Sequence, residues 1–293
     1  MSTGQRGVPP PHRVGPTVVA VVGVLVAVVG CSPTATAPAS DESASASSPA
    51  RCRVVPASGT DGPPPAARDR LRASCTRALP TVEQVWPAWT GTAVILVSAD
   101  AFEPGTAARV EGLAREGEPS RGDRIVVAPG LTDSLSPEGL DIVLRHELAH
   151  LAMRGTGTAA LPLWASEGIA MHVGYAPVVG PRRERRAELM RLRDRVEQGG
   201  WPATVPAPSR FEDSADRADA YSAAWLGVEV LIDRLGRDRV LQAVSEAATQ
   251  AAPGAAGEAR TDEDRTRLLL RSLGVGERRF AELWRAELVR RTT

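Results

Sequence analysis

Two histidines and a glutamate stand close together in the stretch VLRHELAHLA, residues 143–152. If this stretch is helical, His146 and His150 lie one turn apart on the same face, and both imidazoles can reach a single metal ion. A zinc ion with three protein ligands keeps its fourth position for water and lowers the pKa of that water to about 7. Glu147 can take a proton from this water and deliver it to a leaving amine. These residue types at this spacing favour peptide-bond hydrolysis with one Zn²⁺ ion per chain.

A chance match is the alternative, because a pattern with three fixed positions also arises at random. The chain has only 4 His, yet two of them form this pair. The residues between and around the pair include an apolar set: Leu144, Leu148, Ala149 and Leu151. Burying two histidines and a glutamate beside such a stripe would be costly without a purpose. We therefore interpret the stretch as a metal site.

A third ligand is expected from the stretch LPLWASEGIAMHV, residues 161–173. It offers Glu167, at a distance from His150 that allows the chain to turn into an antiparallel helix. The competing ligand is His172, although its spacing does not suit the metzincin pattern, in which a third histidine follows the helix closely. In the alternatives without a metal role, Glu167 is a surface carboxylate and His172 is exposed or supports another residue.

The run Trp164-Ala-Ser-Glu167-Gly168-Ile-Ala170, following the histidine pair, resembles the gluzincin branch of zinc metallopeptidases. The smaller peptidase MA-like proteins of that branch are the nearest comparison, over residues 91–236. The resemblance implies an α+β, zincin-like fold, with a small mixed sheet, an active-site helix and a mainly helical C-terminal subdomain. It also implies that a strand before the active helix binds substrate, here residues 124–129. Finally, it implies an oxyanion-stabilising tyrosine, for which Tyr221 is the candidate.

Two points in this resemblance stay open. Tyr221 could instead be a half-buried helix residue with its hydroxyl at the surface. Larger relatives of thermolysin carry an acid shortly after the third ligand that orients a ligand histidine. The residues after Glu167 contain no acid, so either Asp141 or a backbone carbonyl would have to orient the histidine, or the site is looser.

The spacing of apolar residues, and the residues that typically begin and end helices, predict the strands and helices that would position these side chains. Buried strands are expected at residues 91–99 and 123–130. The histidine helix should begin after Ser136, which can cap it, with Pro137 in its first turn, and end near Gly155. Helices are further expected at residues 66–79, stopping at Pro80, and at 81–89, 162–173, 181–198, 216–236, 262–273 and 277–290. The helix at 181–198 is highly charged and is expected to be solvated.

The N-terminal residues predict that the chain is exported, and they are not expected to belong to the folded domain. Residues 1–31 combine a short basic region, an apolar run and the sequence VVGC, which resembles the bacterial lipobox with Cys31 as the lipidated residue. The alternatives are an ordinary signal peptide with an incidental cysteine, or an uncleaved anchor. Residues 32–50 read as a flexible Ser/Ala/Pro-rich tether. The folded domain is expected at residues 51–293, with a helical lobe from about 161–293.

In the oxidising compartment that export implies, Cys52 and Cys75 are expected to form a disulfide, with two buried free thiols as the alternative. The formal net charge of +0 gives no electrostatic case for nucleic acid as a partner. The partners expected are a peptide or protein substrate and a membrane reached through the lipid. Two other functions stay open: a non-catalytic envelope lipoprotein in which the zinc site is structural or the fold is a binding scaffold, and an amidase acting on cell-wall peptides.

Lipidation at Cys31 predicts that the full chain incorporates labelled palmitate in a bacterial host, and that Cys31→Ser does not. The measurement is the label carried by the purified protein. A wild-type chain that carries no label would end the lipoprotein interpretation.

Overall fold

The computed structural model describes residues 51–56, 62–100, 102, 106–112, 122–156, 161–176, 182–251 and 261–293. The described part is a mixed α+β structure with one small sheet, so the predicted α+β class is confirmed. The signal, the tether and Cys31 all fall within residues 1–50, outside the described residues. Among the helices that are described, none combines the length and apolar character needed to cross a membrane.

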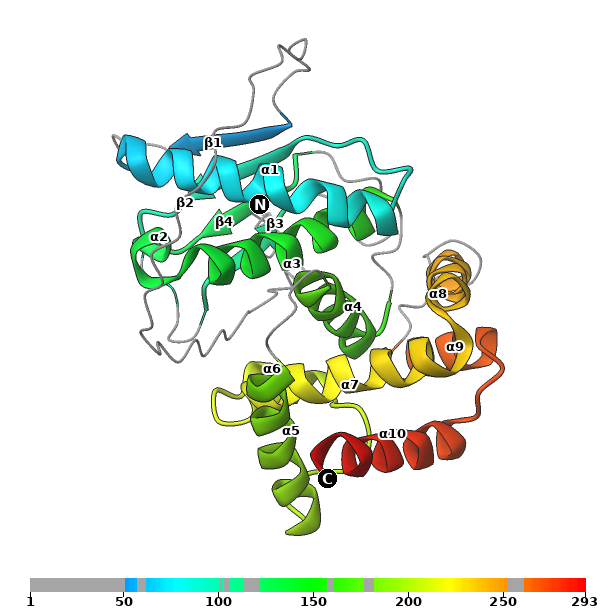
Figure 1. Ribbon diagram of the computed structural model, residues 1–293. Coiled ribbons are helices and arrows are strands. Elements are labelled where there is room, and N and C mark those ends of the chain that lie inside the picture. Colours follow the sequence, from blue (N-terminus) through cyan, green and yellow to red (C-terminus); the bar gives the residue numbers. More distant parts are fainter. Residues whose placement is uncertain are drawn as a thin grey trace, which may run out of the picture.

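The sheet has four strands in the order β1-β2-β4-β3 (Figure 1). Its strands are β1 Cys52–Pro56, β2 Ala93–Val97, β3 Ala108–Glu111 and β4 Arg124–Val127. The strands β1, β2 and β4 are parallel, and β3 pairs antiparallel with β4. The predicted strands at 91–99 and 123–130 are therefore confirmed as β2 and β4, whereas β1 and β3 were not predicted.

Two long helices cover this sheet. They are α1 Pro65–Val85 and α3 Pro137–Gly155, with the single-turn helix α2 Leu131–Ser134 leading into α3. The helix α1 packs on α3 and β1, and α3 packs on β3 and β4. At the start of α3, the Ser136 hydroxyl accepts a hydrogen bond from the Gly139 N–H at 3.1 Å, which confirms the expected cap.

The predicted helix stop at Pro80 is wrong, because α1 runs through this proline to Val85. Proline costs about 3 kcal/mol in a helix interior, but Pro80 lies on the exposed face. Leu79 and Val82 on either side of it are buried in the core. Burial of each such side chain contributes roughly 1.5–3 kcal/mol, which offsets the cost and keeps the last turn helical.

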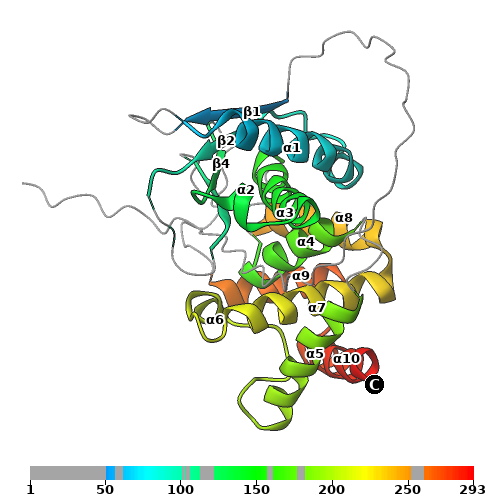
Figure 2. The same cartoon turned by 60° about the vertical axis from the view of Figure 1, so that its left-hand side comes forward.

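The C-terminal region is helical throughout its described parts (Figure 2). Its helices are α4 Leu163–Tyr175, α5 Arg182–Glu197, α6 Pro208–Glu212, α7 Arg217–Leu235, α8 Arg237–Ala251, α9 Asp262–Ser272 and α10 Glu277–Thr292. The predicted helices at 162–173, 181–198, 216–236, 262–273 and 277–290 match five of them, and α6 and α8 were not predicted. The helix α7 packs on α4, α5, α6, α8 and α10, and α4 also packs on α3. Thus α4 joins the sheet-bearing part to the helices around α7.

The charged helix α5 is less solvated than the sequence suggested. Leu189 and Leu192 are buried, and so is Arg185 at 6% exposure. The regular arginines and glutamates of this helix obscure the apolar stripe that packs against α7 and α10.

The Cys52 and Cys75 sulfurs lie 1.98 Å apart, at disulfide distance, and join β1 to α1. Replacing both cysteines with alanine is expected to lower the free energy of unfolding by about 3 kcal/mol, because the crosslink restricts the unfolded chain. Denaturant unfolding of the wild type and of the double variant measures this loss.

Addition of a reductant serves as the control for the disulfide. It should destabilise the wild type to a similar degree and leave the double variant unchanged. Equal stability of the two proteins, with two more titratable thiols in the wild type than in the double variant, would show that Cys52 and Cys75 are free.

Candidate metal centre

Three side chains from two packed helices converge at one point. His146 and His150 come from α3, and Glu167 comes from α4. The two histidine Nε2 atoms lie 3.0 Å apart, and each lies 3.3 Å from the Glu167 Oε2. All three residues are buried, with exposures of 0%, 6% and 1%. The described residues contain no other group of three potential ligands, so the ligand set expected from the sequence is the one that the fold brings together.

These distances fit a shared metal ion. Two donor atoms that each lie about 2.0–2.1 Å from a tetrahedral ion are about 3.3 Å from one another. The three separations of 3.0, 3.3 and 3.3 Å form a triangle of that size. Two imidazoles and one carboxylate also leave a fourth tetrahedral position for another ligand.

Buried polar atoms at the site support the same interpretation. The carboxylate of Glu147 has no hydrogen-bond partner among the described residues, and that of Glu167 has only the two imidazoles within 3.3 Å of its Oε2. A buried carboxylate without a partner is unfavourable by several kcal/mol. A cation held by Glu167 and the two histidines would compensate this charge, so the residues present fit a bound metal ion.

The protonation states that the fold favours are those that a metal ion requires. Burial lowers the pKa of His146, which favours its neutral form. Burial alone would raise the pKa of Glu167, but the His150 and His146 imidazoles outweigh it and bring this pKa down to about 2. Burial, together with the negative charge of Glu167, raises the pKa of Glu147 well above its usual value. Glu167 is therefore ionised, as a metal ligand must be, and Glu147 has a stronger affinity for protons than an ordinary carboxylate.

The helix α4 is fixed firmly enough to hold Glu167 in place. A Cβ on Gly168 would come within 2.4 Å of the Ala224 carbonyl oxygen, so glycine allows α4 to approach α7 this closely. The Trp164 indole N–H donates to the Thr266 hydroxyl at 3.0 Å. The Leu163 N–H, at the start of α4, donates to the Asp262 carboxylate at 2.7 Å. The tryptophan and glycine of the local sequence pattern thus anchor the helix that carries the third ligand.

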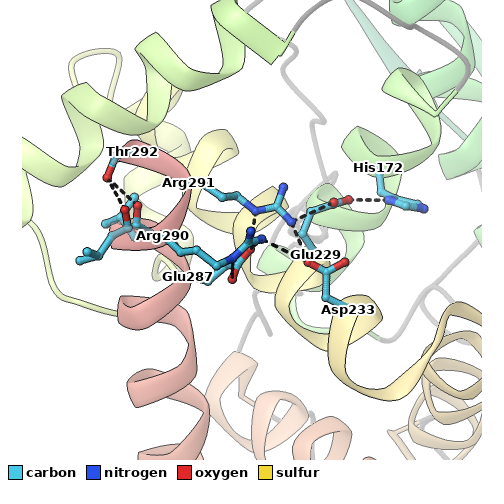
Figure 3. A network of polar contacts seen from close by, with 9 residues as sticks. His172, Glu229, Asp233, Glu287, Arg290, Arg291 and Thr292 are labelled. Atoms are coloured by element: carbon cyan, nitrogen blue, oxygen red, sulfur yellow. Dashed lines mark hydrogen bonds and ion pairs between the residues drawn. The ribbon is translucent and has the colours of Figure 1, made fainter.

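His172, the competing third ligand, is used elsewhere. Its Nδ1 lies 2.6 Å from the Glu229 Oε1, and it is not part of the three-ligand group. Figure 3 shows that Glu229 also pairs with Arg291, which in turn contacts Asp233 and Glu287. His172 therefore ties α4 to α7 and α10 through a network of charged groups.

The suggestion that Asp141 orients a ligand histidine is wrong. Asp141 accepts a hydrogen bond from the Ser74 hydroxyl at 2.5 Å and pairs with Arg77 at 2.7 Å, both on α1. The His146 Nδ1 has no hydrogen-bond partner among the described residues. Ser166, which the sequence did not single out, places its Oγ 3.4 Å from the His150 Nδ1. Its only sequence signal is its position next to Glu167.

Tyr221 lies beside the metal ligands. Its ring centroid is 6.2 Å from that of His146, with an angle of 67° between the rings. The residue is 3% exposed, so it is more buried than the half-buried alternative assumed. The fold thus brings a phenol from α7 next to the two ligand helices.

The strand at 124–129 does not form a free edge for substrate. Ile125, Val126 and Val127 of β4 pair with β2 on one side and with β3 on the other. The expectation failed because β3, which covers that side of β4, was not recognised in the sequence. In the described sheet the outer strand on this side is β3.

No family model matches the chain, and neither do the curated proteins or the solved structures with which it was compared.

Glu167→Gln is expected to weaken metal binding by more than the 10–100-fold that loss of a supporting residue typically costs, because it removes the one anionic ligand. Metal affinity is measured by titrating the metal-free protein with Zn²⁺. Glu138→Gln is the matched control, since Glu138 is exposed in the first turn of α3 and should leave the affinity unchanged. Equal affinities in the wild type and in Glu167→Gln would remove Glu167 from the ligand set.

Proposed function

We propose that this chain is a zinc-dependent metallopeptidase of gluzincin type. The observation that carries the proposal is the buried triangle of two imidazoles and one carboxylate, with the unpartnered Glu147 beside it. His146, His150 and Glu167 would hold the ion. When bound, zinc supplies Lewis acidity and lowers the pKa of a water molecule to about 7.

Glu147 is the proposed general base and acid. Its buried carboxylate has no competing partner among the described residues, and its pKa is raised by burial and by Glu167. It would accept a proton from the attacking water and deliver it to the leaving nitrogen. The scissile C–N bond would then break to give a carboxylic acid and an amine, with one water consumed.

Tyr221 is the proposed stabiliser of the oxyanion. A phenol next to the ligand His146 can donate a hydrogen bond to an oxygen on which negative charge develops. The burial of Tyr221 supports this role, because a donor in a water-excluded site interacts more strongly with a charge than a donor in water does.

The proposed substrate is a peptide or protein at the bacterial cell envelope. This placement depends on the signal and lipidation motif of residues 1–31, which would carry the domain across the membrane and tether it there.

A second candidate is a non-catalytic envelope lipoprotein with a structural zinc ion. It is favoured by one observation: His146 Nδ1 lacks an orienting partner among the described residues, whereas catalytic zinc sites usually supply one. The two candidates differ in outcome, because a structural site binds zinc and hydrolyses no peptide.

Glu147→Gln is expected to abolish hydrolysis of a peptide library, by at least about 100-fold, while the zinc content stays near one ion per chain. The amide keeps the shape of the side chain but cannot accept the proton. Hydrolysis is measured by mass spectrometry of the digest, and zinc by elemental analysis of the same sample.

Tyr221→Phe in the same assay should retain zinc and lower kcat more than it raises KM, because it removes a hydrogen bond made in the transition state.

Undiminished hydrolysis by Glu147→Gln would remove Glu147 from the mechanism. Zinc binding by a wild type that cleaves no peptide in a broad library would instead support the structural candidate.

A further inference from the structure

Arg185 of α5 is a buried cation with little compensation. Its side chain is 7% exposed, and among the described residues its one acidic contact is at 3.4 Å, between Nη1 and the Glu188 Oε2. Its Nε and Nη2 atoms are buried and have no hydrogen-bond partner among the described residues. A buried guanidinium normally has its N–H groups paired with acceptors, so the Nε and Nη2 groups of Arg185 lack an acceptor.

Two aromatic rings lie against this guanidinium. The Arg185 Cζ lies 3.6 Å from the centroid of the Tyr175 ring and 4.3 Å from that of Trp225. Stacking on aromatic faces holds the planar group while its N–H bonds point outward in the plane. Such a fork matches the two oxygens of a carboxylate, which it binds more strongly than it binds a neutral acceptor.

The nearby Glu229 does not fill this role. Its carboxylate bonds the His172 Nδ1 at 2.6 Å and pairs with Arg291 at 3.5 Å (Figure 3). Burial alone would raise the pKa of Glu229, but its two partners and the positive charge of Arg185 outweigh this effect and lower that pKa. The acceptor that Arg185 lacks must therefore come from outside the described contacts.

Arg185 lies next to the proposed active site. Trp225 follows Tyr221 by four residues on α7, a rise of about 6 Å along the same face, and the Tyr221 ring contacts that of His146. Tyr175 ends α4, the helix that carries Glu167. A Cβ on Gly174, the residue before Tyr175, would lie 3.6 Å from the Cβ of His146, so this end of α4 packs directly against the histidine helix.

We propose that Arg185 binds a carboxylate of the peptide substrate. This inference rests on the proposed peptidase function and specifies its substrate class. The carboxylate has two possible sources, the C-terminus of the peptide or an Asp or Glu side chain. A C-terminal carboxylate would make the enzyme cleave a short distance from the end of its substrate, whereas a side chain would make it select acidic sequences.

Peptide binding to the zinc-loaded full chain carrying Glu147→Gln tests the role of Arg185, because that variant should bind peptides without cleaving them. Three peptides of one neutral core sequence are compared by calorimetry: one with a free C-terminal acid, one amidated with a single Glu, and one amidated without any acid. One of the two acid-bearing peptides is expected to bind about 10–100-fold more tightly than the neutral peptide, and that peptide identifies the source.

Arg185→Met and Arg185→Lys in the same background should remove most of this preference, because neither offers a guanidinium fork. Arg191→Met is the matched control, since Arg191 is an exposed arginine of the same helix and should leave the preference unchanged. Zinc content and unfolding midpoint establish that each variant is folded. A loss of the preference in Arg191→Met equal to that in Arg185→Met would overturn the assignment to Arg185.

Equal affinity of the intact Arg185 protein for all three peptides would overturn the inference, even if the Arg185 variants fail to fold. Failure of the proposed function looks different: the wild type would cleave none of the three peptides. Cleavage of all three at equal rates would support the peptidase and contradict the role of Arg185.

Discussion

The packing of α3 against α4 is the constraint on which the rest of the structure depends. It brings two imidazoles and a carboxylate within 3.0–3.3 Å of one another in the core, where an unpaired charge is unfavourable. Every other feature of the site is arranged around this contact. The sheet and α1 support α3 from one side, and α7 supports α4 from the other.

The support of α4 is unusually specific for a short helix. Gly168 permits contact with the α7 backbone, Trp164 bonds Thr266, and Asp262 accepts from the first N–H of the helix. His172, near the end of α4, is bonded to Glu229. Four attachments along one helix leave Glu167 little freedom to turn away from the histidines. The C-terminal helices therefore act as the scaffold that positions the Glu167 carboxylate next to the two imidazoles.

Residues with a strong local signal were predicted from the sequence. The HExxH spacing identifies His146 and His150, and the cap at Ser136 and the glycine at 155 bound their helix. Glu167 was recognised from the pattern around it. The strands β1 and β3 were missed because each is four or five residues long and β3 alternates apolar with charged residues. Strand pairing over such short segments is decided by tertiary contacts, so the assignment of a free edge to residues 124–129 failed with it.

Residues whose surroundings come from other helices had no local sequence signal. Asp141 is on the histidine helix yet bonds Ser74 and Arg77 on α1. Pro80 stays within a helix because its neighbours are buried. Arg185 looked like one of many arginines on a charged helix, and only the fold shows it against the rings of Tyr175 and Trp225. Its role depends on which side of α5 faces α7, and charge patterning alone does not specify that side.

X-ray absorption at the zinc edge of the metal-loaded wild-type protein tests the central claim most directly. The account predicts one zinc ion per chain with a first shell of nitrogen and oxygen at about 2.0–2.1 Å, of which two ligands show the multiple scattering of imidazole. A sulfur shell at about 2.3 Å, fewer than two imidazoles, or a protein that retains no zinc would contradict it.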